Sequence, residues 1–422
     1  MRTIKRCLAL FAFLPLLAAA CAPPACVPPA DGAAAKARVS PGAESSPLSD
    51  PLVPASVPPG IGARSAVLAD AATGTVLFSL HPNLQIPPAS LTKLMTIHLV
   101  LEEIAAGRAF ADEILVPPEE SWAQNQAPRS SLMFLGRNQR VSLGELLLGL
   151  AVSSGNDAAT AAALRFAPTV EDFVSLMNAE AAALGLSSTR FADPAGLSGD
   201  NTTTAADFAR FCSLYIAAHP ESPALLHSVR EFAYPLAANM TAPVRAPTIV
   251  QNNFNSLLGR FEGVDGLKTG HIPEAGYNIA LTARRGGTRL VAVVLGADSE
   301  KRRAADGEAL LSWGFDNFET IRPPAPEFPP ARIWKGKEKY AELELEKPPV
   351  LSVSKNRAAL LSWELDINAA LEAPLPKGAR AGTLVLRDET GELLRAPLLL
   401  KNAAPKGGFW RSLFDSIGLV FI

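Results

Sequence analysis

Ser90 and Lys93 stand three residues apart at the start of a strongly apolar segment that runs on to Ile104. On a helix this spacing puts both side chains on one face, about 5–6 Å apart at Cβ, and a helix that is apolar on most faces is expected to be buried. Burial disfavours the ammonium form of lysine, and a neutral amine beside a hydroxyl forms a base and nucleophile pair. Taken alone, the two residues are also compatible with a helix-capping serine and a surface lysine.

The sequence Ser-Gly-Asn at 154–156 separates two segments of helical periodicity, 143–151 and 158–166. One interpretation is a helix–helix turn in which Asp157 caps the second helix. The other interpretation places the serine hydroxyl and the asparagine amide at a helix end that faces a cleft. The motif by itself does not decide between the two.

A third segment holds a cation and a hydroxyl side by side, Lys268 and Thr269, followed by Gly270. These side chains suit a carboxylate, and Gly270 would let a substrate backbone approach the strand closely. The alternative is a short strand that ends at a turn, with Lys268 in solvent. However, Ser-x-x-Lys, Ser-x-Asn and Lys-Thr-Gly in this order are a set found in penicillin-binding proteins and class A β-lactamases. Chance is therefore a poor explanation of all three motifs together.

Residues 88–96 (Pro-Ala-Ser-Leu-Thr-Lys-Leu-Met-Thr) resemble the active-site segment of the low-molecular-mass penicillin-binding proteins that are D-alanyl-D-alanine carboxypeptidases. Residues 154–158 and 265–271 are similar to the second and third motifs of that family. The resemblance extends over about residues 63–320, and over 323–400 in architecture only. It implies a serine-type peptidase.

The resemblance also implies a role for each candidate residue. Ser90 would attack the carbonyl between the two terminal D-alanines of a peptidoglycan stem peptide, with Lys93 as its base and Ser154 as proton relay to the leaving D-alanine. The backbone N–H groups of Ser90 and His271 would form the oxyanion hole. Hydrolysis of the acyl-enzyme would follow, and β-lactam antibiotics would acylate Ser90 as substrate mimics. The residues expected to bind substrate are Asn156, Lys268, Thr269, Gly270 and His271.

One position departs from the family pattern. Some members carry an arginine upstream of the third motif, near the substrate carboxylate, and Phe254 takes that position in this chain. Arg303, which aligns with another basic position of the family, would compensate in part. Lys268 would therefore bind the carboxylate without the arginine that those members carry, and with Arg303 as a partial substitute.

Several other chemistries are disfavoured. A histidine-based triad would need a G-x-S-x-G segment, which the sequence lacks, and Lys93 already supplies the base. The motifs H-E-x-x-H, P-loop and G-x-G-x-x-G are also missing, so we expect no metal and no cofactor. A net charge of −2, from 39 Lys+Arg and 41 Asp+Glu, argues against nucleic-acid binding.

Three other functions remain compatible with the same motifs. A D-alanyl-D-alanine endopeptidase would use the same residues on a cross-linked peptide. A β-lactamase would share the fold, although the sequence lacks the E-x-x-L-N deacylation motif and extends well beyond the catalytic region. A non-catalytic cell-wall scaffold would keep the cleft but not the reaction.

The N-terminus has the pattern of an export signal. Residues 1–20 combine basic residues, a short apolar run and three alanines, which predicts a signal peptide, because a spanning helix needs ~20 apolar residues. Cys21 follows directly and is either a lipid attachment site, in a box that resembles that of bacterial lipoproteins, or a plain cysteine after ordinary cleavage. Residues 21–62 are rich in Pro and Ala and predict an extended linker. We expect an enzyme at the periplasmic face of the inner membrane.

The pattern of elements predicts an α+β fold. Two apolar strand pairs, around 72–74 and 285–287, enclose a long helical stretch. The expected catalytic domain, 63–322, therefore has an antiparallel sheet flanked by helices with an inserted helical lobe, as in the penicillin-binding and β-lactamase fold. A run of prolines then leads to a small β-rich domain over 323–402. Apolar residues at helical spacing over 403–422 predict an amphipathic helix in a membrane surface, with docking onto the β domain as the alternative.

Overall fold

The computed structural model describes residues 36–38, 54–241, 246–355, 361–389 and 391–419. The expected signal peptide and Cys21 lie outside these residues, as does most of the expected linker. The described residues form two compact units, one of Ser56–Asp316 and the other of 317–419 together with 36–38 and 54–55. Each unit has its own hydrophobic core.

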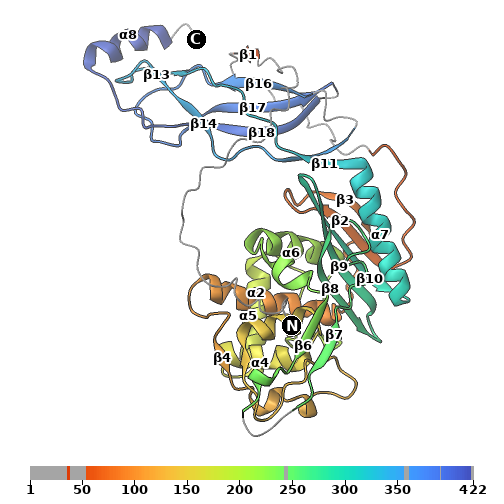
Figure 1. Cartoon of the computed structure of the whole chain (residues 1–422). Helices are drawn as coiled ribbons and strands as arrows, with labels where there is room; N and C mark the ends of the chain where they lie inside the picture. The colour runs from red at the N-terminus through yellow and green to blue at the C-terminus, as the bar shows by residue number, and fades with distance from the viewer. Residues whose placement is uncertain (1–35, 39–53, 242–245, 356–360, 390, 420–422) are drawn as a thin grey trace, which may run out of the picture. The chain divides into compact units, whose positions relative to one another are not determined.

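The first unit is built on a five-stranded antiparallel sheet in the order β3-β2-β10-β9-β8 (Figure 1). The strands are β2 (Ser65–Asp70), β3 (Val76–Leu80), β8 (Val264–Ile272), β9 (Gly276–Arg285) and β10 (Thr288–Ala297). Val67 of β2 lies opposite Val293 of β10, so the two predicted hairpins share one sheet. Every residue of β2 is buried, which explains why its four central residues are apolar on both faces.

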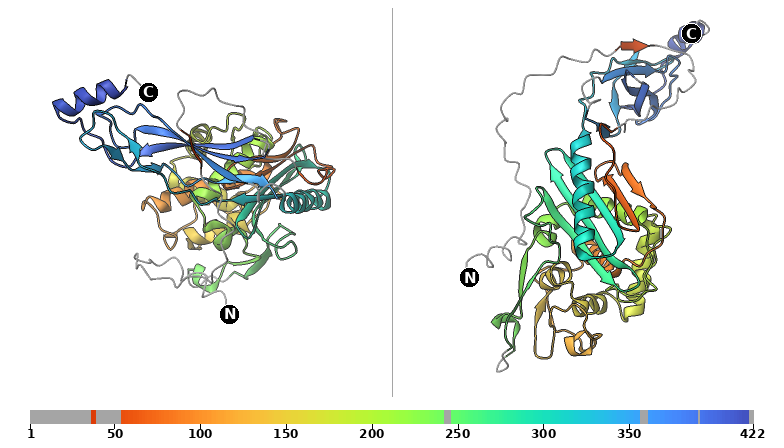
Figure 2. Two further views of the ribbon diagram at one scale, coloured as in Figure 1. Left: turned by 90° about the horizontal axis from the view of Figure 1, so that it is seen from above. Right: turned by 90° about the vertical axis from the view of Figure 1, so that its right-hand side faces the viewer.

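Helices cover both faces of this sheet (Figure 2). α7 (Glu300–Asn317) runs along one face, and α6 (Ala205–Ala218) packs against β2 and β10 on the other. The other long helices of the lobe are α2 (Lys93–Ala105), α3 (Leu143–Ala151), α4 (Asn156–Phe166) and α5 (Val170–Ala183). Their apolar side chains join those of the sheet in one core. The predicted α+β architecture with an inserted helical lobe is therefore confirmed.

Side-chain caps fix where several lobe helices begin. Ser142 Oγ accepts from Glu145 N at 3.2 Å, and Ser142 N donates to the Glu145 carboxylate at 2.8 Å, a reciprocal capping box at the start of α3. Thr169 and Thr204 cap α5 and α6 without the reciprocal bond: each side chain accepts one hydrogen bond from the backbone N–H three residues later. The shorter elements of this unit are η2 (Ala89–Thr92), β4 (Ile114–Leu115), η3 (Glu119–Ser121), η4 (Ala123–Asn125), β5 (Val141–Ser142), η5 (Pro223–His227), β6 (Glu231–Tyr234), η6 (Ala237–Asn239) and β7 (Ile249–Asn252).

The second unit is a β domain around a five-stranded sheet in the order β1-β16-β17-β18-β14. Its strands are β1 (Lys36–Arg38), β14 (Leu343–Leu345), β16 (Ser362–Ile367), β17 (Arg380–Asp388) and β18 (Gly391–Leu400), with the smaller pairs β11 (Phe318–Ile321) and β15 (Leu351–Ser354), and β12 (Ala331–Arg332) and β13 (Tyr340–Ala341). Trp363, Leu384 and Leu398 are among the side chains that fill its core. The expectation of a small all-β domain after the catalytic domain is confirmed.

The stretch expected to be only a linker carries structure at two places. β1 pairs in parallel with β16, because an edge strand offers unpaired backbone groups to any extended segment. At the start of the first unit, Gly62 N and Ala63 N donate to the Asp306 carboxylate on α7 at 3.1 and 2.9 Å. Trp313 on the same helix donates to Ser56 O at 3.1 Å. The ordered part of the first unit thus begins before residue 63.

The C-terminal helix α8 (Phe409–Leu419) is docked by its polar side and exposes its apolar side. Asp415 is buried and accepts from Arg332 Nη2 and Lys335 N, both at 2.7 Å, within the β domain. The exposed large side chains of the helix are Phe409, Trp410, Leu413, Phe414 and Ile417. Among the described residues, no helix combines the length and the apolar character that crossing a bilayer requires.

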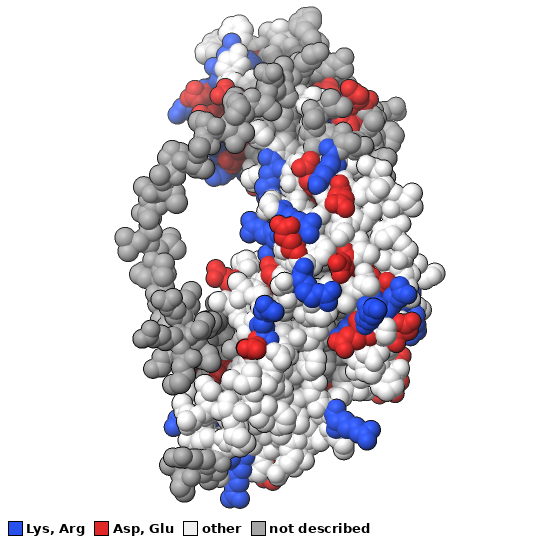
Figure 3. Space-filling model, turned by 45° about the vertical axis from the view of Figure 1, so that its right-hand side comes forward, with Lys and Arg blue, Asp and Glu red and all other residues white. Residues whose placement is uncertain are grey.

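Charged side chains of both signs are mixed on the face drawn in Figure 3, where Lys and Arg lie among Asp and Glu. A nucleic-acid-binding face would instead gather Lys and Arg in a stripe or patch. This face therefore gives no support to a nucleic-acid partner.

Candidate active site

Ser90 lies on η2, immediately before the long helix α2. Ala89 has a φ of 52°, a left-handed conformation that is uncommon for a residue with a Cβ. Asn278 on β9 holds this segment in place, because its Nδ2 donates to the carbonyls of Pro87 at 2.9 Å and Pro88 at 3.2 Å. The sheet thus fixes the backbone that presents the Ser90 hydroxyl.

Lys93 is the first residue of α2 and has no exposed surface. Its Nζ lies 3.0 Å from Ser90 Oγ. It also lies 2.7 Å from Asn156 Oδ1 and 2.6 Å from the carbonyl oxygen of Ala195. The expected burial of Lys93 on the same face as Ser90 is confirmed, and the amine joins the first motif to the second.

Burial also changes the proton affinity of this amine. It lowers the pKa of Lys93 to about 7, against the opposing effect of the Asp193 and Asp157 carboxylates. At neutral pH a substantial share of Lys93 is therefore the neutral amine, which is the form that can accept a proton from a hydroxyl.

The second motif forms the corner between α3 and α4. Ser154 is buried with a φ of 56°, and Asn156 is the first residue of α4. The two sequence interpretations are not exclusive, because this corner is a helix–helix turn and also brings Asn156 to Lys93. The assignment of Asp157 as the cap of the second helix is wrong: Gly155 is the N-cap residue, and the Asp157 side chain is turned toward another segment.

Asp157 anchors the loop beside the second motif. Its carboxylate is buried and accepts from Met133 N and Leu135 N, both at 2.9 Å. Burial raises the pKa of Asp157, and the backbone N–H groups that it accepts from oppose that change. Asn156 N in turn donates to Ser131 O at 2.8 Å. Sequence reasoning missed this anchoring role, since the segment 131–135 lies outside any helix or strand.

The third motif lies on β8, next to η2. Lys268 and Thr269 are both buried, which excludes the alternative of a solvent lysine. Gly270 packs so closely that a Cβ built on it would be 2.9 Å from Ser90 N and 2.9 Å from Pro88 O. Only glycine fits there without displacing the backbone that carries Ser90. The segment that approaches Gly270 closely is η2 of the protein itself, whereas the sequence led us to expect a substrate backbone at this position.

Two cationic side chains, Lys93 and Arg303, lie close to Lys268 of the third motif. Lys268 Nζ donates to Thr269 O at 3.0 Å, and burial, followed by the charges of Lys93 and Arg303, lowers its pKa well below the usual value. Arg303 is itself buried; it donates to Glu300 at 2.7 Å and to Gly270 O at 3.4 Å. Arg303 therefore lies beside the third motif, with Glu300 as its main partner.

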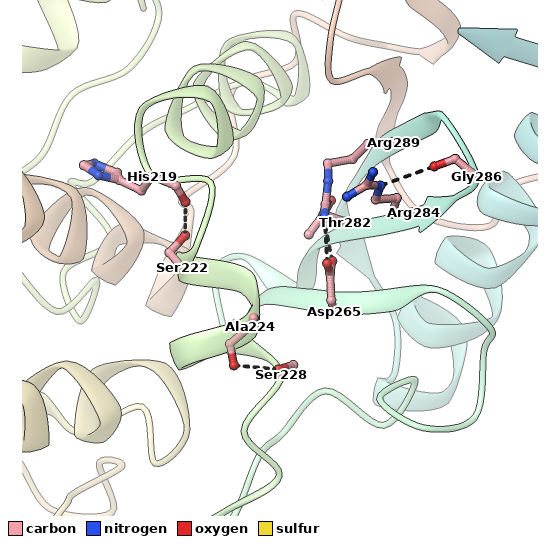
Figure 4. A network of polar contacts seen from close by, with 9 residues as sticks. All are labelled: His219, Ser222, Ala224, Ser228, Asp265, Thr282, Arg284, Gly286 and Arg289. Carbon is pink, nitrogen blue, oxygen red and sulfur yellow. Dashed lines mark hydrogen bonds and ion pairs between the residues drawn. The ribbon is translucent and has the colours of Figure 1, made fainter. Parts of the chain in front are cut away.

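The start of β8 is tied to the sheet by a bidentate ion pair. Arg289 on β10 donates both Nη atoms to the Asp265 carboxylate at 2.9 Å each, and Nη1 also to Thr282 Oγ1 at 3.0 Å. Figure 4 shows these three side chains bridging neighbouring strands. The third motif is thus carried by a rigid strand.

Two further predicted positions are exposed. His271 directly follows the glycine of the third motif, and its ring lies against Tyr277 with centroids 4.1 Å apart. Phe254, at the position where some relatives carry arginine, is 46% exposed. It lines a depression of about 460 Å³ with neighbours that include Asn253 and Glu300.

A loop that carries no sequence motif supplies the third group in contact with Lys93 Nζ, the carbonyl oxygen of Ala195. Asp193 organises it by accepting from Ala195 N and Ser198 N, both at 2.7 Å. Gly196 has a φ of 80°, and a Cβ on it would collide with the carbonyl oxygen of Ala89. Sequence reasoning missed this loop because a backbone carbonyl such as that of Ala195 has no residue signature.

A serine in contact with a buried lysine, together with an antiparallel sheet and a helical lobe, is characteristic of the penicillin-binding class of serine enzymes. Within this class, the chain belongs to the D-alanyl-D-alanine carboxypeptidase family, whose model matches residues 53–299. A second model, that of the C-terminal domain of penicillin-binding protein 5, matches residues 324–406. The protein is therefore a serine-type peptidase of this family.

Individual relatives agree with this assignment. The chain is 33% identical to the D-alanyl-D-alanine carboxypeptidase DacC of Escherichia coli over 369 aligned residues. The aligned region covers 86% of this chain and 89% of the relative. The structure of penicillin-binding protein 5 from Haemophilus influenzae matches with a TM-score of 0.75 and 32% identity over 83% of this chain and 100% of that one. Ampicillin-bound penicillin-binding protein D2 from Listeria monocytogenes matches with a TM-score of 0.52 and 31% identity, over 60% of this chain and 98% of the Listeria chain.

Proposed function

We propose that the protein removes the terminal D-alanine from peptidoglycan stem peptides through an acyl-enzyme on Ser90. The observation that carries this proposal is the contact between the Ser90 hydroxyl and the fully buried Lys93, whose Nζ lies 3.0 Å away. Because burial lowers the pKa of Lys93 to about 7, the amine can take the hydroxyl proton at neutral pH. Membership in the D-alanyl-D-alanine carboxypeptidase family supports the choice of bond.

The reaction has two stages. In acylation, Ser90 Oγ attacks the carbonyl carbon of the penultimate D-alanine and its proton passes to Lys93 Nζ. The C–N bond to the terminal D-alanine then breaks, and the leaving nitrogen receives that proton through Ser154 Oγ. In deacylation, Lys93 takes a proton from water, the hydroxide attacks the ester carbon, and the bond to Ser90 breaks. The proton on Lys93 returns to Ser90 Oγ, which completes the cycle.

Two backbone N–H groups, those of Ser90 and His271, would hold the carbonyl oxygen as it becomes negative. The proposal is supported by the close packing of β8 against η2, since a Cβ on Gly270 would lie only 2.9 Å from Ser90 N. Removing one donor of an oxyanion hole typically lowers kcat by about 10²–10³.

Lys268 and Thr269 would bind the terminal carboxylate of the substrate. Burial and two neighbouring cations lower the pKa of Lys268 in the free enzyme, and an incoming carboxylate acts in the opposite direction, because an opposite charge favours the ammonium form. Asn156 Nδ2 would donate to a carbonyl of the peptide. Arg303 would add positive potential behind the third motif, although its guanidinium is bonded to Glu300.

β-Lactam antibiotics would acylate the same serine, since their amide carbonyl takes the place of the scissile one. The ampicillin-bound form of the related protein from Listeria monocytogenes supports this part of the proposal. After ring opening the leaving nitrogen stays attached to the acyl group, so it does not diffuse away as D-alanine does.

We also propose that the enzyme works at the periplasmic face of the inner membrane. Residues 1–20 would be removed as a signal peptide, with Cys21 as a possible site of lipid attachment. The catalytic domain would comprise 63–322 and the β domain 323–402. The segment 403–422 would rest on the membrane surface, a proposal supported by the exposed apolar side of α8.

Release of D-alanine from diacetyl-Lys-D-Ala-D-Ala by the purified full-length protein tests the proposed function. The wild type should release D-alanine, Ser90→Ala should release none, and Ser79→Ala, which changes an exposed serine on β3, should match the wild type. Release only from cross-linked peptides would identify an endopeptidase instead. Rapid turnover of penicillin would identify a β-lactamase. If the protein reacts with none of these substrates, it would be a non-catalytic scaffold.

A further inference from the structure

Three potential metal ligands meet between α2 and the end of α6, apart from the residues assigned to catalysis. His98 and Glu102 are four residues apart on α2, and His219 is the C-cap residue of α6. His98 Nδ1 lies 2.8 Å from His219 Nε2, which lies 3.3 Å from Glu102 Oε1. The three ligand atoms all lie within 4.8 Å of one another.

This geometry suits a single tetrahedral ion. Nitrogen and oxygen ligands lie about 2.0–2.2 Å from zinc, so two such atoms on one ion are roughly 3.3–3.5 Å apart. The two imidazoles would need to separate by roughly 0.5 Å, and the contact between His219 and Glu102 would need almost no change. Two histidines and one carboxylate are a donor set that zinc uses, with a water in the fourth position.

The groups around the cluster match the surroundings of a metal-binding histidine. Such a histidine usually donates its second ring N–H to a carboxylate or carbonyl, which fixes the tautomer. Glu180 on α5 occupies that place, with Oε1 3.2 Å from His98 Nε2. With this N–H donated to Glu180, Nδ1 of His98 carries the lone pair and accepts the hydrogen bond from His219 Nε2 in the metal-free protein. When an ion binds, that proton would move to His219 Nδ1, so that both facing nitrogens offer a lone pair.

His219 is held from its backbone. Its carbonyl accepts from Ser222 Oγ at 2.8 Å, and its N–H donates to Tyr215 O at 2.8 Å. Figure 4 shows the imidazole extending away from Ser222, on the side of the residue opposite its carbonyl.

Access to the cluster comes from one side. His98 and His219 are 4% and 9% exposed, whereas the side chain of Glu102 is 48% exposed. An ion would therefore enter past Glu102 and bind the two imidazoles behind it. None of the three side chains contacts Ser90 or Lys93 in the proposed mechanism, so the cluster has no assigned part in peptide cleavage.

We propose that His98, Glu102 and His219 form a binding site for a divalent transition-metal ion of the zinc type, with Glu180 orienting His98. Bound metal would clamp α2 to the end of α6 and so stabilise the helical lobe. α2 also begins with Lys93, so the same clamp would brace the helix that carries the base. The competing account is a histidine pair that forms one hydrogen bond and binds nothing.

Titration of the metal-free full-length protein with ZnCl₂ distinguishes the two accounts. Calorimetry should detect one zinc per chain and thermal unfolding should shift to a higher Tm, while CoCl₂ should give the intense visible bands of a four-coordinate ion. Glu102→Ala, which changes a half-exposed side chain and should fold normally, should abolish the Tm shift. Glu180→Gln should weaken zinc binding by about 10–100-fold, the usual effect of removing an outer partner.

His81→Gln is the matched control, because it removes an exposed histidine outside the cluster. This variant should bind zinc as the wild type does. Absence of both heat and Tm shift in the wild type would overturn the proposal. Binding of equal strength in Glu102→Ala and in a well-folded His219→Gln variant, verified by circular dichroism, would overturn it as well, as would loss of binding in His81→Gln.

Discussion

Asn156 Oδ1 lies 2.7 Å from Lys93 Nζ, and this contact determines how a neutral Lys93 must be oriented. A neutral amine has two N–H groups and one lone pair. The amide oxygen of Asn156 and the carbonyl oxygen of Ala195 can only accept, so they take the two N–H groups. The lone pair is then directed at the third neighbour, the hydroxyl of Ser90, which is the arrangement that proton abstraction requires.

The rate of Ser90 acylation should depend on the protonation of Lys93. Its pKa is lowered to about 7, and only the neutral form accepts a proton, so the acylation rate should rise with pH through about 7 and then level off. The second-order rate constant for benzylpenicillin, measured from pH 5.5 to 9, checks this. A constant rate across that range, or one that falls as pH rises through 7, would contradict the role of Lys93 as base.

Asp193 should set where this transition occurs. Its carboxylate raises the pKa of Lys93 and so opposes the effect of burial. Asp193→Asn removes that charge while keeping the shape, so the midpoint of the acylation profile should move to lower pH. Asp200→Asn, at an exposed position of the same loop, is the control and should leave the midpoint in place. A midpoint that moves equally in both variants, or upward in Asp193→Asn, speaks against this electrostatic coupling.

Gly270→Ala should inactivate the enzyme without unfolding it. The new Cβ would lie 2.9 Å from Ser90 N and 2.9 Å from Pro88 O, so either η2 or β8 must shift. Because displacement by about 1 Å can lower a rate 10²-fold, we expect kcat/KM for D-alanine release to fall by at least about 10². In Gly199→Ala the nearest atom is a flexible Glu274 Cγ at 3.8 Å, so that variant should keep wild-type activity. Comparable activity in the two variants would mean that the close approach is unimportant.

The apolar side of α8 should bind lipid surfaces. Trp410, Phe414 and Ile417 are 57–69% exposed while Asp415 docks the opposite side of the helix. Changing all three to serine should remove most co-sedimentation of the full-length protein with phospholipid vesicles. Val76→Ser, which removes an exposed apolar side chain from β3, should have no effect. Equal co-sedimentation of the triple variant and the wild type would show that the apolar side of α8 does not bind lipid, and that the helix only packs against the β domain.

Most of the chemical groups of the candidate site could be predicted, because each lies in a short motif. The spacing of Ser90 and Lys93 puts both on one helical face, and the apolar residues that follow indicate burial. The same logic located the strand with Lys268 and Gly270. The sheet was predictable because alternating apolar hairpins at both ends of a helical stretch have few ways to bury their faces.

The supporting residues could not be predicted, since their roles depend on contacts between distant segments. Asn278 acts through Pro87, 191 residues earlier in the chain, and Asp157 acts through the backbone of Met133. Ala195 contributes only a carbonyl, which every residue has. The pairing of His98 with His219 across 121 residues likewise depends on how α2 and α6 pack, and no spacing rule connects them.

The mass of the intact protein after reaction with benzylpenicillin tests the central claim most directly. If Ser90 is the nucleophile paired with Lys93, the wild type should gain the mass of one antibiotic molecule, and peptide mapping should place it on Ser90. Lys93→Met should form the adduct far more slowly, and Ser90→Ala should form none. An adduct on another residue, or a Ser90→Ala variant that is acylated as fast as the wild type, would contradict the proposed mechanism.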